Sequence, residues 1–366
     1  FRVPIGVGGF ICPWNFPMAI PTWKLFPALV CGNTAVFKPA ELTPKTAHTL
    51  VEIIDAAMRE VLGKDYIPGV INLVHGKGSV VGEAITNHED IDLISFTGST
   101  DVGKRINAVA GASLKRVSLE LGGKNAQIVM DDANQDLALE AVLWGAFGTT
   151  GQRCTATSRL ILHEKIYDEF IKKLVAKAGK LRLGYGNDKG VDVGPCVSES
   201  QRNSVNEYVQ IGKNEDKAKL VLGGEFANDG TLAKGWFYKP TIFVDVTPEM
   251  RIAKEEIFGP VLSVIKTTGL EDAINILNNT KYGLSSSIFT NNVNDAFTAV
   301  RDIRAGITYV NGATIGAEAH MPFGGVKQTG NGHREGGWTV YDFYTEWKAV
   351  YIDYSGKLQR AQIDNY

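Results

Sequence analysis

The residue best suited to covalent chemistry in this chain is a cysteine in a polar context. Cys154 lies in the glycine-led stretch GQRCT, whereas a purely structural cysteine more often lies in an apolar run, as Cys31 does. A thiolate at Cys154 would be a nucleophile for an electrophilic carbon. The alternative is an inert thiol, because the exposure and pKa that decide its reactivity cannot be read from the sequence.

An acid and an amide have contexts that suit them to assist such a nucleophile. Glu120 lies in the apolar segment SLELGG, where loss of water would raise its pKa and make it a general base. The alternative is a glutamate on an edge strand whose side chain points to water. Asn15 lies between two prolines in PWNFP, which restrict the backbone around a side chain able to donate a hydrogen bond to an oxyanion. A rigid hydrophobic turn is the alternative for that segment.

Two further segments carry groups that could hold an anion or a cofactor. The predicted strand at residues 93–97 runs into Gly98 and Ser99 and then into a helical pattern, so N–H groups at the helix N-terminus could bind a pyrophosphate. The spacing is not G-x-G-x-x-G, and an ordinary strand-to-helix turn is the alternative. Lys38 and Glu41 in KPAE also follow a predicted strand, at the edge where open α/β sheets bind ligands. For this pair the alternative is a solvated loop.

The elements that must position these groups alternate between strand-length apolar runs and helical periods. Such alternation predicts an α/β fold with parallel sheets and right-handed crossovers. The first series has strands at residues 3–12, 34–37, 70–74, 93–97 and 116–119, and a helix at 44–62. The second has strands at 125–130, 159–163, 261–265, 286–289 and 306–310, and helices at 137–147, 166–181, 272–277 and 295–303.

The ends of the two series suggest a boundary and an appendage. The corner Leu121-Gly122-Gly123 is the predicted boundary between the two units. Residues 347–354 alternate in strand fashion, which predicts either a strand that joins the sheet of another subunit or an edge strand of its own domain.

The composition is that of a globular protein. The chain has 366 residues, 44% of them hydrophobic, which excludes a disordered chain and suits two domains and an appendage. A net charge of −2 without long single-sign runs argues against nucleic acid as a partner. Without an apolar run of ~18 residues or signal-peptide order, we expect no membrane contact and a cytoplasmic location. The four cysteines lack CxxC spacing, so neither a disulfide scaffold nor a metal site is expected.

Taken together, the motifs resemble those of the NAD(P)-dependent aldehyde dehydrogenase superfamily. The chain contains, in that family's order and at about its spacing, PWNFP, KPAE, FTGSTDVG, LELGGKNA, GQRC, EEIFGPV and PFGGVKQTG. The resemblance implies two Rossmann-like α/β domains, one cofactor-binding and one catalytic, plus a small C-terminal β arm for oligomerisation. It implies a cofactor-binding domain at 1–120, a catalytic domain at 121–318, a return to the cofactor-binding domain at 319–345, and the arm at 346–366.

The resemblance also implies roles for individual residues. It makes Cys154 the nucleophile and Glu120 the general base, with the Asn15 side chain and the Cys154 backbone N–H as the oxyanion hole. It places the adenosine ribose at Lys38 and Glu41. The other cofactor-binding residues that it implies are Trp14, Gly98, Ser99, Gly103, Glu256 for the nicotinamide ribose, and Phe258 beside the nicotinamide. Around the aldehyde it places Phe16, Trp23 and Phe323, together with the loop 314–321, in which Glu318 and His320 are unusual residues.

These residue types fit the chemistry of that family. Attack of the Cys154 thiolate on an aldehyde gives a thiohemiacetal, hydride loss to NAD leaves a thioester, and water deprotonated by Glu120 releases the acid. Glu41 near the adenosine 2′-hydroxyl would repel a 2′-phosphate, which favours NAD over NADP. The alternatives are a CoA-acylating or phosphorylated-aldehyde dehydrogenase of the same fold and a catalytically silent homologue. A Cys–His thiol hydrolase is a weaker alternative, because none of the six histidines lies in a partner motif.

Two expectations concern the substrate and the whole protein. Aromatic walls suit a small or medium aldehyde, and the C-terminal stretch resembles bacterial or archaeal members that act on semialdehydes of carboxylic acids. Members of the family carry a long segment before PWNFP, so we expect this chain to be a shortened form of a longer protein. By the resemblance, that full-length protein is a homodimer or homotetramer.

Overall fold

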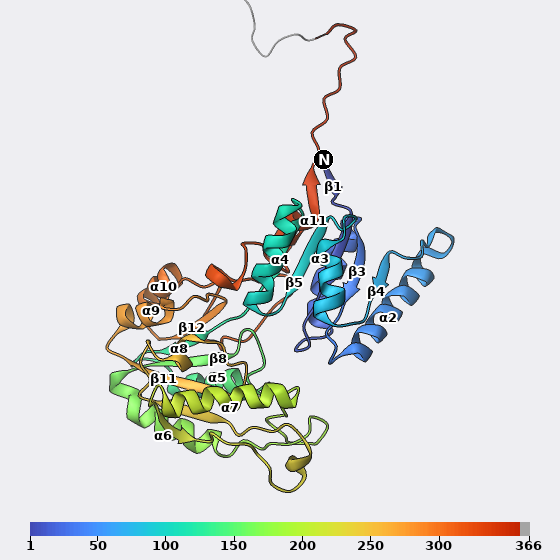
Figure 1. Cartoon of the computed structure of the whole chain (residues 1–366). Helices are drawn as coiled ribbons and strands as arrows, with labels where there is room; N and C mark the ends of the chain where they lie inside the picture. The colour runs from blue at the N-terminus through green and yellow to red at the C-terminus, as the bar shows by residue number, and fades with distance from the viewer. Residues whose placement is uncertain (359–366) are drawn as a thin grey trace, which may run out of the picture.

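The computed structural model describes residues 1–358 and has two α/β lobes, each built around its own parallel sheet (Figure 1). The five-stranded sheet has the order β4-β3-β2-β5-β6 and the seven-stranded sheet the order β13-β12-β7-β8-β11-β10-β9. Within these two sheets all strand pairs are parallel except β9 with β10. The predicted α/β class with parallel sheets is confirmed.

The first lobe is formed mainly by the N-terminal third of the chain. Its strands are β2 (Val7–Ile11), β3 (Thr34–Lys38), β4 (Ile71–Leu73), β5 (Leu93–Thr97) and β6 (Arg116–Glu120). Its α-helices are α1 (Ala19–Val30), α2 (Pro44–Leu62), α3 (Glu83–Asn87), α4 (Thr100–Ala112) and, far along the chain, α11 (Tyr341–Tyr344).

The second lobe follows after a short connection. Its strands are β7 (Asn125–Val129), β8 (Thr157–His163), β9 (Lys219–Leu222), β10 (Thr241–Val244), β11 (Val261–Thr267), β12 (Ser285–Phe289) and β13 (Ile307–Val310). Its α-helices are α5 (Gln135–Phe147), α6 (Tyr167–Ala178), α7 (Glu199–Asn214), α8 (Arg251–Lys254), α9 (Leu270–Asn278) and α10 (Val293–Asp302).

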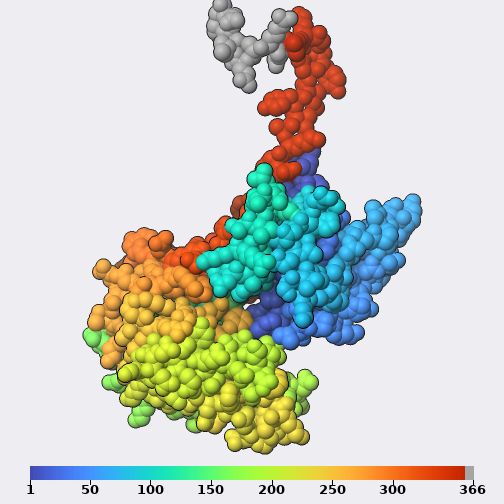
Figure 2. All heavy atoms as spheres, viewed as in Figure 1, coloured from blue at the N-terminus to red at the C-terminus, as the bar shows by residue number. Residues whose placement is uncertain are grey.

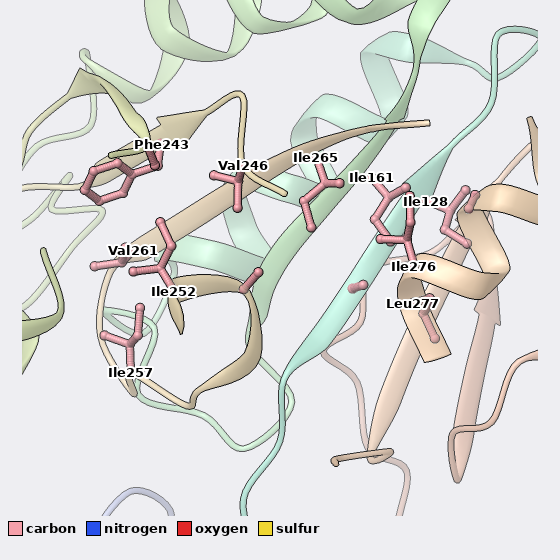
Figure 3. Packing of buried hydrophobic residues seen from close by; sticks show 14 of the residues in the cluster. Ile128, Ile161, Phe243, Val246, Ile252, Ile257, Val261, Ile265, Ile276 and Leu277 are labelled. Atoms are coloured by element: carbon pink, nitrogen blue, oxygen red, sulfur yellow. The ribbon is translucent and has the colours of Figure 1, made fainter. Parts of the chain in front are cut away.

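Each sheet is buried on both faces. Successive side chains of a strand point to opposite sides, so each strand contributes to two cores. In the second lobe Ile128, Ile161 and Ile265 belong to one core, where Figure 3 shows them on neighbouring strands near Ile276 of α9. The next residue along β7, Val129, belongs to the other core, which α5 and α6 cover. In the first lobe α1, α2 and α11 cover one face and α3 and α4 the other. This double burial explains why the strands read as continuous apolar runs.

The predicted strand at residues 3–12 is wrong in one respect, because it is broken at Gly6. The chain forms β1 (Arg2–Pro4), turns at Gly6 with φ of +139°, and resumes as β2. A side chain at Gly6 would overlap the Asp92 carboxylate, since an added Cβ would lie 2.2 Å from its Oδ2. The Asn33 side chain fixes the corner: its Oδ1 accepts from the N–H groups of Ile5 and Gly6, and its amide donates to the carbonyl of Tyr344 in α11.

The predicted strand at 347–354 is also wrong in its bounds. The strand here is β14 (Thr345–Trp347), which pairs antiparallel with β1 of the same chain, as Figure 1 shows beside the N-terminus. Residues 348–358 form no strand, because an alternating segment needs a hydrogen-bonded partner strand and none lies beside it within the described residues. Of the arm expected at 346–366, residues 359–366 lie outside the described part of the chain. Among residues 1–358, no helix combines the length and apolar character needed to cross a membrane.

Candidate active site

One edge of the first sheet gathers the groups expected from four separate motifs. Asn15 follows β2, Lys38 ends β3, Ser99 follows β5 and Glu120 ends β6. The register pairs Thr97 with Glu120, so the ends of β5 and β6 are level. Carboxyl ends of parallel strands meet at one edge, and ligands of open α/β sheets bind there.

The second lobe presents to this edge the segments that precede its strands. Gly123 precedes β7, Cys154 precedes β8, and Glu256 and Phe258 precede β11. Figure 2 shows a hollow between the two lobes on the face in view. The site is therefore a junction between the strand ends of one sheet and the strand beginnings of the other.

Cys154 lies where two cavities meet. A cavity of about 190 Å³ is lined by Cys154, Glu120, and the aromatic side chains of Phe16, Trp23 and Phe323. The second cavity, of about 260 Å³, is lined by Cys154 and by segments of both lobes. Its other lining residues are Pro13, Trp14, Asn15, Thr97, Gly98, Ser99, Leu121, Gly122, Gln201, Glu256 and Phe258. A sulfur shared by two cavities can react with a molecule in one while a second molecule occupies the other.

The loop around Cys154 is held by an asparagine that the sequence reasoning missed. The Asn125 side chain donates from Nδ2 to the carbonyls of Cys154 (2.7 Å) and Ala156 (2.9 Å). Gly123 packs against the same loop, since an added Cβ would lie 2.6 Å from the Cys154 carbonyl oxygen. The signal in the sequence was the run GGKN at the start of β7, where a polar side chain enters a buried strand.

The Cys154 thiol is neutral at physiological pH in this state. Burial raises its pKa to about 12, and the nearby Glu120 and Glu256 carboxyls add to the rise, while the Thr155 N–H opposes it. Attack by this sulfur therefore needs a group that takes its proton.

Glu120 is buried, although β6 is an edge strand, so the alternative of a glutamate pointing to water is wrong. It is 3% exposed, and burial, assisted by the charge of Glu335, raises its pKa well above the usual range. The strand edge is covered by the chain around Gly330, whose backbone bridges to Glu120. A carboxyl with a raised pKa beside a thiol is suited to proton transfer.

A buried ion pair beside Glu120 was not found from the sequence. Lys24 of α1 donates to the Glu335 carboxylate and, at 2.9 Å, to the Ser95 hydroxyl. Lys24 is fully buried and Glu335 is 3% exposed. The available signal was Lys24 itself, the one charged residue of the apolar helix AIPTWKLFPALV. This pair fixes the charge balance around Glu120, since Lys24 lowers and Glu335 raises its pKa.

The aromatic residues expected around the aldehyde lie together. Trp23 and Phe323 pack edge to face with ring centroids 5.4 Å apart, and Phe16 lines the same cavity. From the loop 314–321 only Gly316 and Ala317 line this cavity. Glu318 and His320, the unusual residues of this loop, are exposed and do not line the cavity.

The second cavity has features that fit a dinucleotide. Ser99 precedes the 13-residue α4, whose first-turn N–H groups are free to meet a phosphate. Trp14 and Phe258 pack edge to face at 5.5 Å, and Phe258 has φ of +55°, an unusual backbone for a residue with a side chain. Glu256 accepts from the Gly123 N–H at 2.9 Å, and burial raises its pKa to about 7.

Three expected cofactor residues lie outside that cavity. Lys38 is buried at the same sheet edge, with Nζ donating to the Pro39 carbonyl at 2.7 Å. Glu41 is exposed and accepts from the Gly78 N–H at 3.2 Å. Gly103 lies inside α4, where an added Cβ would overlap Leu121, so its smallness lets α4 approach that segment.

The remaining candidate chemistries find little support at this junction. No histidine lines either cavity that contains Cys154, so the arrangement offers no Cys–His pair. Among residues 1–358, no group of three or more His, Cys, Asp or Glu side chains is arranged to hold a metal ion.

Comparison with known proteins places the chain in a family. Residues 1–350 match the Aldehyde dehydrogenase family. The chain is 44% identical over 351 residues to alpha-ketoglutaric semialdehyde dehydrogenase of Bacillus subtilis, covering 96% of this chain and 70% of that one. It is 46% identical over 357 residues to mouse aldehyde dehydrogenase, cytosolic 1, covering 97% and 68%.

A solved structure gives the same result. A double mutant of betaine aldehyde dehydrogenase from Staphylococcus aureus in complex with NAD+ superposes with a TM-score of 0.92 at 35% identity, over 98% of this chain and 70% of that one. The matching family, the shared fold and the junction at Cys154 agree. The chain belongs to the aldehyde dehydrogenase family, whose members are oxidoreductases that act on aldehydes.

Proposed function

We propose that this chain oxidises an aldehyde to a carboxylic acid with NAD as the electron acceptor, through a covalent bond to Cys154. The observation that carries the proposal is the position of Cys154, which lines both the aromatic cavity and the cavity suited to a dinucleotide. An aldehyde in the first cavity and a nicotinamide in the second would both lie beside the same sulfur.

The first step is attack of the Cys154 sulfur on the aldehyde carbon, which forms the thiohemiacetal. Because burial raises the thiol pKa to about 12, Glu120 in the same cavity acts as the base that removes its proton. The oxyanion is stabilised by the Asn15 amide and the Cys154 backbone N–H. In support, Asn15 lines a cavity that Cys154 also lines.

NAD, when bound, supplies the acceptor for the hydride that leaves the thiohemiacetal carbon. Ser99 and the N-terminus of α4 would hold its pyrophosphate, Glu256 a ribose, and the Trp14–Phe258 pair one side of its nicotinamide pocket. We assign Lys38 and Glu41 to the adenosine ribose, since Lys38 ends β3 and Glu41 follows it at the same sheet edge. A carboxylate at Glu41 disfavours a 2′-phosphate, so NADP should be the poorer cofactor.

The last step is hydrolysis of the thioester by a water that Glu120 deprotonates, after Glu120 has released the proton taken from the thiol to solvent. A buried carboxyl with a pKa well above the usual range is poised for this task. Transfer to coenzyme A or to phosphate, the alternatives within this fold, would need another nucleophile in place of that water. Product analysis with and without coenzyme A and phosphate separates these reactions.

The decisive experiment measures NADH formation with a panel of aldehydes for the unchanged chain, Cys154→Ala and Cys31→Ala. We expect Cys154→Ala to lower kcat by roughly 10³-fold or more while NAD binding persists, because the nucleophile is gone. Cys31→Ala removes a partly exposed thiol that lines neither cavity and serves as the matched control. Oxidation by Cys154→Ala at the parental rate would refute the mechanism, and no turnover with any aldehyde would support a silent homologue.

Finer points of the proposal concern substrate, assembly and location. The semialdehyde named for the Bacillus subtilis relative makes semialdehydes of carboxylic acids the first substrates to test. Assembly as a homodimer or homotetramer is proposed on the exposed apolar residues Tyr351, Ile352 and Tyr354 beyond β14. A cytoplasmic location is proposed from the similarity to the cytosolic mouse enzyme.

A further inference from the structure

The aromatic cavity contains a cation that the oxidation of an aldehyde does not require. Arg153 is the only basic residue among those that line this cavity; no lysine, histidine or second arginine lines it. It directly precedes Cys154, and both residues line this cavity. None of the steps proposed above uses it.

The guanidinium is fixed in place by contacts that leave most of its donors unused. Its Nε donates to the Thr149 hydroxyl at 2.9 Å, and its carbon lies 5.3 Å from the Phe16 ring centroid and 5.6 Å from that of Trp144. Within the described residues, no carboxylate forms an ion pair with Arg153, and its terminal nitrogens donate no hydrogen bond to protein. An arginine has five N–H donors in a planar fork, so four of these remain for a ligand.

The carboxyl groups in the same cavity do not compensate this charge. Glu335 is already paired with Lys24, and the pair is neutral as a unit. Glu120 is the other carboxyl, and it forms no ion pair with Arg153, so the guanidinium has no carboxylate partner on the cavity wall. A partly buried cation without a partner favours an anion in that cavity.

We propose that Arg153 binds a carboxylate of the substrate, so that the site selects aldehydes that carry a carboxylate a few carbons from the reacting carbonyl. The inference rests on the proposed function and adds the residue that decides which aldehydes are preferred. Arginine matches a carboxylate with two parallel N–H···O bonds, which fixes the orientation of the substrate as well as its charge. The aromatic walls formed by Phe16, Trp23 and Phe323 suit the methylene groups between the two ends.

The first test compares kcat/KM for glutaric semialdehyde and for pentanal, an uncharged aldehyde of the same chain length. In Arg153→Met we expect the ratio of the two values to fall about 30-fold, mainly through KM, because the charge-assisted pair is lost. Arg153→Lys keeps the charge without the fork and should recover part of the ratio.

The matched control is Arg202→Met, because Arg202 also packs on two aromatic rings, at 4.4 Å and 5.0 Å from Phe226 and Trp236, but lines neither cavity. Its ratio should equal that of the unchanged chain. A ratio in Arg153→Met that equals the control would overturn the assignment while leaving aldehyde oxidation intact.

A second test needs no turnover and no variant that must fold. Glutarate should bind to the unchanged chain in calorimetry at least tenfold more tightly than its diamide, and binding should weaken as salt rises. Equal affinities for glutarate and the diamide would overturn the role of Arg153 whether or not the chain oxidises aldehydes. Failure of every aldehyde together with selective glutarate binding would instead refute the proposed function alone.

Discussion

Replacing Lys24 with methionine should destabilise the protein severely, because it leaves a charge buried without its partner. Lys24 is fully buried and Glu335 is 3% exposed, so water cannot take the place of the lost ammonium. Breaking a buried pair by removing one partner costs about 3–5 kcal/mol, since the remaining ion keeps its desolvation penalty. The loss of the 2.9 Å bond to Ser95 adds to this. We therefore expect Lys24→Met to lie at the upper end of that range.

The companion variants separate the ion pair from the packing of the methylene chain. Glu335→Gln keeps an oxygen that can accept from Lys24, so it should cost less than Lys24→Met. The double variant Lys24→Met with Glu335→Leu removes both charges and should recover at least half of the loss, because no ion is left without a partner.

The free energy of unfolding is measured by urea titration with tryptophan fluorescence, for the single and double variants. Lys239→Met is the control, because it breaks an exposed 2.7 Å pair with Glu225 and should barely move the midpoint. A loss below ~1 kcal/mol for Lys24→Met would refute the reasoning, as would a double variant less stable than both singles. Either result would mean that water reaches the pair.

Three further predictions concern the junction between the lobes. Without cofactor, the rate of Cys154 alkylation by iodoacetamide should rise about tenfold per pH unit without a plateau below pH ~10, because the thiol pKa is raised to about 12. Mass spectrometry measures this rate, and a plateau near neutral pH would contradict the raised pKa. Glu120→Gln should slow thioester hydrolysis by roughly 10²-fold or more and hydride transfer less, because the thiol can also lose its proton to solvent before it attacks. An acyl adduct on the chain should then accumulate after a burst of NADH; a steady rate without adduct would count against the base. Gly122→Ala should raise KM for NAD about tenfold with little change in the aldehyde KM, since an added Cβ would lie 2.2 Å from the carboxylate of Glu256, the residue proposed to hold a ribose. Equal effects on the two KM values would disprove the role of Glu256 in NAD binding.

Local signals in the sequence recover much of the fold because each sheet is covered on both faces. Such strands are continuous apolar runs bounded by turns, and the range predicted at 93–97 coincides with β5. Helix α2 matches its predicted range of 44–62, since Pro44 is favoured at the first helical position. By contrast α1 was not delimited, because Pro27 within it is read as a helix breaker. Tertiary packing of Leu25 and Ala28 overrides that propensity.

The site was predictable where a motif lies within a few residues, and not where distant segments meet. Cys154 and Glu120 were found because each lies in an unusual short context, and both line the aromatic cavity. The pairing of Lys24 with Glu335 joins residues 311 positions apart, which no local pattern encodes. Arg153 was visible in the motif GQRC, but its lack of an ionic partner depends on the fold around it.

The arrangement of the site separates the groups that react from the groups that stabilise. Asn15 and Cys154 lie on segments just outside the strands and Glu120 is the last residue of β6, so their side chains face a junction and not the packed faces of the sheets. Substitutions there should change rates more than folding, because each sheet keeps its two cores. Lys24 and Glu335 are the exception, since they are buried in the first lobe and also set the charge beside Glu120. Stability and proton transfer are therefore coupled through this pair, and a variant that loosens it should impair both together.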